Sequence, residues 1–161
     1  MPNKRPTVGD TAPNASLLDQ DRKQRNLSEF WHDGKALIAF FPGAFTSVCT
    51  KEMCTFRDEM SKFNNLEANV VGVSVDNPFV LKGFAEKNSL NFTLLSDYAR
   101  EAVKAYSVEL PDFAGMRGYT AAQRSVFIVG KDGKIKYVWV AENPGIEPNY
   151  SELEKELSRI R

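Results

Sequence analysis

The stretch KALIAFFPGAFTSVCTKEMC, residues 35–54, predicts the centre of the fold and contains both cysteines of the chain. Its apolar run after Lys35 predicts a buried strand, which a Pro-Gly pair ends. Thr46 or Ser47 can then cap a helix. Later apolar residues recur at spacings of four, three, four and three, which places them on one buried face of this helix: Cys49, Met53, Phe56, Met60 and Phe63.

Turn residues and apolar periodicity predict further elements on either side of this stretch. Residues 15–30 and 124–140 each predict a β-hairpin, the second around an Asp-Gly turn. The other expected elements are strands at 69–76 and 92–96 and helices at 78–88, 98–106 and 149–160. The expected helix starts are Asp76 and Asn77 with Pro78, Ser96 or Asp97, and a capping box of Ser151 and Glu154. Alternating strands and helices, then a hairpin and a closing helix, predict an α/β fold with a mixed sheet flanked by helices.

Composition limits the classes of function open to the chain. Its 161 residues are enough for one domain, residues 1–161, with a sizeable core. The 21 basic and 21 acidic side chains cancel, so the sequence predicts no nucleic-acid partner and favours a small substrate. Residues 1–20 contain no apolar run as long as a secretory signal or a membrane span, which predicts no membrane partner and a cytoplasmic protein.

The two cysteines are candidates for redox chemistry. They are too few for a secreted disulfide framework, and His32, the single histidine, leaves too few ligands for a structural zinc site. The start of a helix stabilises a thiolate, and Cys49 is expected there. Thr46 can place its hydroxyl near that thiolate and a bound oxygen, and Pro42 can keep water out of the pocket. A buried, inert thiol beside an ordinary helix cap is the alternative interpretation.

Cys54 follows Cys49 by five residues. In an ideal helix this spacing separates the two Cα atoms by ~8.6 Å, beyond the ~7 Å at which two cysteines can be bridged. A disulfide between them therefore requires the start of the helix to unwind, which breaks a few hydrogen bonds of about 1 kcal/mol each. Oxidation would then act as a conformational switch.

Pro42, Thr46 and Cys49 match the signature Pro-x-x-x-Thr-x-x-Cys, through which the chain resembles the peroxiredoxins. These are thiol peroxidases with a thioredoxin-like fold, and the predicted β-hairpin is similar to their N-terminal extension. The C-x4-C spacing in CTKEMC resembles the Q-type branch, also called bacterioferritin-comigratory proteins, whereas PGAFT is similar to other branches. The resemblance implies that Arg124, in QRSVFIV, points its guanidinium at the reactive sulfur, and that Glu52 holds this arginine in place.

The activity that the resemblance implies is the reduction of hydrogen peroxide and organic hydroperoxides. Cys49 would become a sulfenic acid, Cys54 would resolve it as a disulfide, and a thioredoxin-like protein would reduce that disulfide. No cofactor or metal is implied, and the protein is expected to be a monomer or a homodimer. Two alternatives stay open: a one-cysteine peroxidase with Cys54 as a bystander, and a non-catalytic redox switch or binding module. A thioredoxin-type disulfide reductase is disfavoured because its chemistry uses C-x-x-C spacing.

Overall fold

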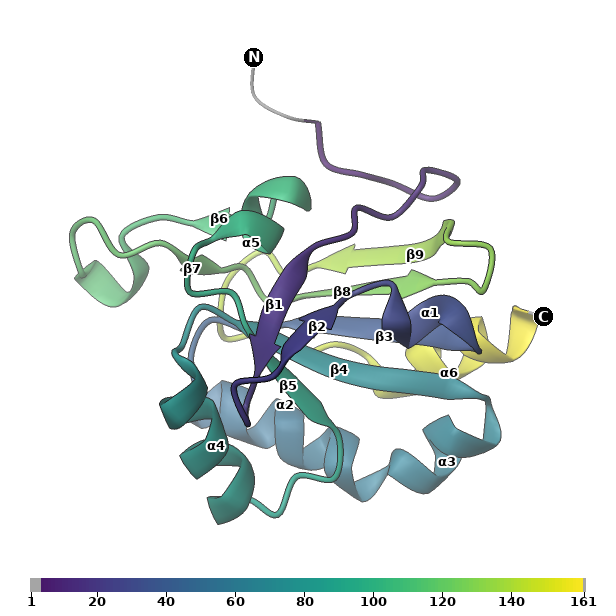
Figure 1. The fold of residues 1–161 in the computed structure, drawn as a ribbon, viewed down its shortest axis with the longest axis horizontal. Helices are drawn as coiled ribbons and strands as arrows, with labels where there is room; N and C mark the ends of the chain where they lie inside the picture. Colours follow the sequence, from purple (N-terminus) through teal and green to yellow (C-terminus); the bar gives the residue numbers. More distant parts are fainter. Residues whose placement is uncertain (1–3, 161) are drawn as a thin grey trace.

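The computed structural model describes residues 4–160, and Figure 1 shows a central sheet with helices on both sides. The strands of this sheet lie in the order β2-β1-β5-β4-β3-β8-β9. β3 is parallel to β4, β4 is parallel to β5, and the other neighbours are antiparallel. A second, two-stranded sheet pairs β6 with β7. The strands are β1 (Ser16–Asp19), β2 (Gln24–Asn26), β3 (Lys35–Phe40), β4 (Ala68–Ser74), β5 (Thr93–Ser96), β6 (Glu109–Leu110), β7 (Ala121–Ala122), β8 (Ser125–Val129) and β9 (Ile135–Val140).

The sheet divides the apolar core into two parts, and helices cover each part. Their side chains show that α2, α3, α4 and α6 pack on one face, and α1 and α5 on the other. Successive residues of β3 serve the two parts in turn, since Ile38 and Phe40 face α1 and α5, whereas Leu37 and Ala39 face α2. This arrangement confirms the predicted α/β class. The helices are α1 (Glu29–His32), α2 (Ser47–Asp58), α3 (Met60–Asn65), α4 (Pro78–Lys87), α5 (Glu101–Ala105) and α6 (Tyr150–Arg159), with a 3-10 turn η1 (Phe113–Gly115) between β6 and β7.

The carboxyl end of β3 is the point at which distant segments meet. The antiparallel register pairs Phe40 of β3 with Ser125 of β8, so Arg124, which precedes β8, lies at the edge where the chain leaves β3 for α2. β4 runs parallel to β3 and ends at the same edge with Ser74, two residues before Asp76. The start of α2, the end of β4 and the start of β8 are therefore neighbours.

The predicted elements are confirmed, but three of their boundaries differ. The helix expected from Thr46 to Phe63 is interrupted at Glu59 (φ −103°, ψ 9°), which separates α2 from α3. The second strand of the N-terminal hairpin ends at Asn26, and the residues expected to extend it begin α1. The helix expected from residue 98 begins only at α5, because Arg100 has a left-handed backbone (φ 61°).

The helix caps were predicted with mixed success. Asn77 accepts a hydrogen bond from the N–H of Val80 at 3.0 Å, which confirms the predicted start of α4. At α6 the predicted capping box of Ser151 and Glu154 is wrong. The side chain of Asn149 caps this helix by accepting the N–H of Glu152 at 3.1 Å, so Ser151 already lies within the first turn.

Candidate active site

Cys49 lies in the first turn of α2 and is fully buried. The backbone of Thr46 at the N-cap is extended (φ −80°, ψ 151°), and its carbonyl accepts the N–H of Thr50 at 2.9 Å, which begins the helix. The N–H groups of residues 47–49 thus precede the first helical hydrogen bond, at the positive end of the helix dipole. The predicted position of Cys49 is confirmed, and this position favours a negatively charged group.

Arg124, the residue before β8, places a cation at the sulfur of Cys49. Its Nη2 donates to the Sγ atom at 3.1 Å, across 75 residues of sequence. The carbonyl of Pro144 accepts two further hydrogen bonds from the same guanidinium, from Nη2 at 2.9 Å and from Nε at 3.2 Å. Arg124 is only 2% exposed, so these contacts hold a rigid, fully charged fork against the thiol.

Glu52 pairs with the other end of this guanidinium. Its Oε1 accepts from Nη1 of Arg124 at 2.7 Å, and both side chains are buried, Glu52 completely. Burial raises the pKa of Glu52 to about 7, because the loss of hydration outweighs the attraction of Arg124. The pKa of Arg124 is raised, since Glu52 and Cys49 outweigh its own burial. Oε2 of Glu52 has no hydrogen-bond partner among the described residues.

Two hydrogen bonds hold the loop between β3 and α2, one within the loop and one to Asp76, which follows β4. The hydroxyl of Thr46 donates to the carbonyl of Gly43 at 2.7 Å and makes no helix-capping hydrogen bond. Its oxygen therefore keeps its capacity to accept a hydrogen bond from a bound molecule. Asp76 fixes the same loop, because its Oδ2 accepts the N–H of Ala44 at 2.7 Å. Pro42 is buried at the beginning of the loop.

Asp76 was predicted only as a cap of the helix that follows it, but Asn77 caps α4, and the side chain of Asp76 lies at the site instead. Its Oδ2 also accepts the hydroxyl of Ser74 at 2.7 Å, and its carbonyl accepts the hydroxyl of Ser96 at 2.6 Å. The only signal was its place directly after a buried strand that runs parallel to the strand before Cys49. Its contact with Ala44 spans 32 residues and depends on the pairing of β3 with β4.

Cys54 lies on the same helix as Cys49 but makes different contacts. Its side chain is partly exposed, and its Sγ lies 3.6 Å from Oδ1 of Asn88, at the end of α4. Both cysteines are free thiols. Residues Ser47–Asp58 form one unbroken helix. In such a helix the two cysteines are too far apart to form a disulfide, so the prediction that the helix must first unwind applies here.

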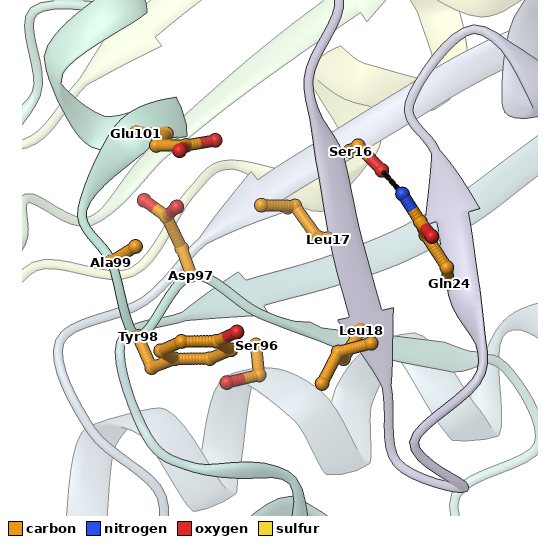
Figure 2. Close-up of a pocket in the computed structure, with 9 residues that line it drawn as sticks. All are labelled: Ser16, Leu17, Leu18, Gln24, Ser96, Asp97, Tyr98, Ala99 and Glu101. Carbon is orange, nitrogen blue, oxygen red and sulfur yellow. Dashed lines mark hydrogen bonds between the residues drawn. The ribbon is translucent and has the colours of Figure 1, made fainter.

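Other polar features of the molecule lie outside this site. A cavity of about 270 Å³ lies between β1 and the segment that follows β5 (Figure 2), and none of the predicted site residues lines it. His32 is exposed at the end of α1. Within residues 4–160, no three His, Cys, Asp or Glu side chains gather as metal ligands. No helix in this part of the chain is long and apolar enough to cross a membrane.

Comparison with protein families identifies the chain. A model of the AhpC/TSA family matches residues 8–138. The chain belongs to the AhpC/TSA family. Peroxiredoxin Bcp of Escherichia coli (strain K12) is 40% identical to the chain over 133 residues, which cover 82% of this chain and 84% of the relative. The chloroplastic peroxiredoxin Q of Populus jackii is 37% identical over 132 residues, covering 81% of this chain and 59% of the relative.

Solved structures agree with these relatives. The crystal structure of peroxidoxin BcpB from Mycobacterium tuberculosis superposes on this peroxiredoxin with a TM-score of 0.85 at 30% identity, over 98% of this chain and 99% of the other. A peroxiredoxin-like protein from Aquifex aeolicus gives a TM-score of 0.86, also at 30% identity, over 98% and 90% of the two chains. The predicted resemblance to peroxiredoxins, the Q-type branch and the thioredoxin-like fold is confirmed.

Proposed function

We propose that this peroxiredoxin reduces hydroperoxides with Cys49 as the nucleophile. The observation that carries the proposal is the 3.1 Å contact between the buried sulfur and Arg124, at the positive end of α2. A fixed cation and a helix N-terminus both favour the thiolate, which is the form that attacks peroxides. Family membership supports the same activity, since the relatives described above are named peroxiredoxins.

The attack transfers one oxygen atom to the sulfur. An electron pair of the Cys49 thiolate forms the S–O bond, the O–O bond breaks, and the leaving oxygen takes up a proton to become water or an alcohol. Arg124 and the N–H groups of the first turn of α2 stabilise the negative charge that moves onto the oxygens. The Thr46 hydroxyl, oriented by its bond to Gly43, accepts a hydrogen bond from the peroxide. Pro42 shields the reacting atoms from water.

Cys54 completes the cycle in this proposal. Its thiol attacks the sulfenic sulfur of Cys49, a disulfide forms, and water leaves. The first turns of α2 must open for this step, and the partly exposed Cys54 lies on a helix face away from the buried stripe. A thioredoxin-like dithiol then reduces the disulfide by exchange. We place this cycle in the cytoplasm, where thiols are kept reduced, and propose that residues 1–161 act as one domain.

Mass spectrometry of the reduced protein after one equivalent of hydrogen peroxide tests the proposal. The wild-type chain should lose two hydrogens, and Cys54→Ser should gain one oxygen at Cys49. A gain of one oxygen in both proteins would instead show a one-cysteine peroxidase. Thr46→Val separates a peroxidase from a redox switch, because a switch without a peroxide site would be oxidised at an unchanged rate. Slow oxidation of the wild-type protein, no faster than that of a free thiol, would refute peroxidase activity.

A further inference from the structure

The buried cluster of Cys49, Arg124 and Glu52 contains two acids and one permanent cation. Cys49 and Glu52 are 0% exposed and Arg124 is 2% exposed, so water screens none of the charges. If both acids were ionised, the cluster would carry a net negative charge in a site of low dielectric constant, which is strongly disfavoured. The cluster is neutral only when the two acids keep one proton between them.

Glu52 is built to keep that proton. Only Oε1 of its carboxyl group is paired with Arg124, at 2.7 Å. Oε2 is buried and has no partner among the described residues, and an ionised oxygen in such a position lacks the hydrogen bonds that would stabilise its charge. A protonated carboxyl group can still accept from Arg124 through Oε1 while Oε2 carries the hydrogen. The pKa of Glu52, raised to about 7, agrees with this arrangement.

We propose that Glu52 holds the proton of the Cys49 thiol, so that the reactive form is a thiolate, a guanidinium and a neutral carboxylic acid. Glu52 is in this role a positioning residue that sets the charge of the cluster and does not touch the peroxide. The inference rests on the proposed peroxidase function. It adds to that function the group that makes a buried thiolate electrostatically neutral.

The groups around Glu52 are compatible with this role. From the loop before α6, Glu147 adds negative charge, which further favours the neutral form of Glu52. Lys51 of α2, whose side chain is exposed, pairs with Glu147 at 3.1 Å. From α6, the hydroxyl of Tyr150 donates to Glu147 at 2.8 Å, and the pKa of Tyr150 is raised, chiefly by burial. Arg124 is the cation paired with the Glu52 carboxyl itself.

The proposal fixes the proton balance of the reaction. The thiolate with neutral Glu52 and one hydroperoxide give a sulfenic acid, ionised Glu52 and one alcohol or water. Hydrogen atoms and charge balance without a proton from solvent, because Glu52 loses the proton that the leaving oxygen requires. In Glu52→Gln the amide carries no such proton, so each sulfenic acid formed must take one proton from solvent.

Two measurements on the same proteins test this balance in a Cys54→Ser background. Ultraviolet absorbance reports how much of Cys49 is thiolate as the pH changes. Stopped-flow mixing with hydrogen peroxide in a weakly buffered indicator dye counts the protons taken up per sulfenic acid. Below about pH 7, both proteins should show a thiolate signal before peroxide is added. The protein that keeps Glu52 (the Glu52 protein) should take up no proton per sulfenic acid formed, whereas Glu52→Gln should take up one. Glu59→Gln, which alters another acid whose Oε2 is buried without a partner, is the matched control and should behave like the Glu52 protein.

The outcomes separate the inference from the function on which it rests. A thiolate signal with one proton taken up in both proteins would show that Glu52 is ionised beforehand, and would overturn the inference. Absence of a thiolate signal in the Glu52 protein at that pH would also overturn it, because the proton would then be on sulfur. Either result leaves the peroxidase function intact if peroxide is consumed rapidly. Absence of rapid consumption refutes the function itself.

Discussion

Removal of the Arg124 guanidinium is expected to abolish most of the peroxidase rate. In Arg124→Met the sulfur loses the donor at 3.1 Å, which is the side-chain cation placed against it. Loss of one preorganised donor to a developing anion typically lowers a rate by about 10²–10³-fold, or about 2.7–4 kcal/mol. Arg124→Lys keeps the charge but not the planar guanidinium that also binds Glu52 and Pro144. Its rate should therefore lie between those of the wild type and Arg124→Met.

Folding must be separated from chemistry in this experiment. Arg124→Met leaves Glu52 buried without its partner, and breaking a buried ion pair typically costs about 3–5 kcal/mol when the remaining group stays charged. Without the guanidinium the cluster is neutral only when Cys49 and Glu52 both carry a proton, so the variant binds one more proton than the wild type and the destabilisation should grow as the pH rises. The double variant Arg124→Met/Glu52→Gln removes the stranded acid and should recover much of the stability.

The assay is the second-order rate of reduced protein with hydrogen peroxide, measured by rapid quench and mass spectrometry alongside thermal unfolding. The double variant should remain slow even where it is as stable as Glu52→Gln alone. The reasoning is refuted if this stable double variant reacts within about threefold of Glu52→Gln, because the guanidinium would then contribute nothing to the transition state.

Four further predictions follow from single contacts. Thr46→Val should lower the peroxide rate by about 10–100-fold in the same assay, since one oriented hydroxyl is lost near the reacting oxygens. Asp76→Ala should lower both the rate and the free energy of unfolding, the latter by about 1–3 kcal/mol, because the loop before α2 loses its buried acceptor. The pKa of Glu52 is raised from 4.5 to about 7 in the folded protein, so the folded state keeps a proton on Glu52 over this pH range. With Cys49 a thiolate in the folded state, as proposed, the unfolded chain keeps the matching proton on the Cys49 thiol, so the free energy of unfolding of the wild type should change little with pH between 4.5 and about 7. In Glu52→Gln the unfolded state binds the extra proton, so denaturant titrations should show a free energy of unfolding that rises with pH. Asn149→Ala should destabilise the protein by about 1 kcal/mol, whereas Ser151→Ala should change it by less than about 0.5 kcal/mol, as measured by thermal unfolding.

Local patterns in the sequence were sufficient to predict α2, which carries Cys49, and β3, which precedes it. The apolar run before Pro42 forms β3. The apolar stripe from Cys49 to Phe63 is buried, and each of its side chains is 9% exposed or less. These features depend on residues near one another in the chain. The break at Glu59 was not predictable in this way, because the apolar stripe continues across it into α3, which packs on β4.

Contacts that span the sheet explain the rest of what the sequence left undetermined. The position of Arg124 was predicted only through the resemblance to a family, since nothing within β8 indicates which strand lies beside it. Asp76 and the carbonyl of Pro144 were missed as parts of the site because each meets it through strand pairing or a loop return. The roles of the site residues stay predictions until the variants described above are measured.

The charges of the cluster also bear on how α2 could open after oxidation. Conversion of the thiolate to a neutral sulfenic acid deprives Arg124 of its anionic partner at 3.1 Å. If Glu52 ionises in the same step, its carboxylate replaces that partner at 2.7 Å, and the guanidinium is never left buried and unpaired. The turn that holds Cys49 then loses its electrostatic attachment to β8, while the neighbouring turn gains one. Oxidation would thus release the segment that must move toward Cys54. When Glu52 loses its proton, Arg124 pairs with the Glu52 carboxylate in place of the Cys49 sulfur.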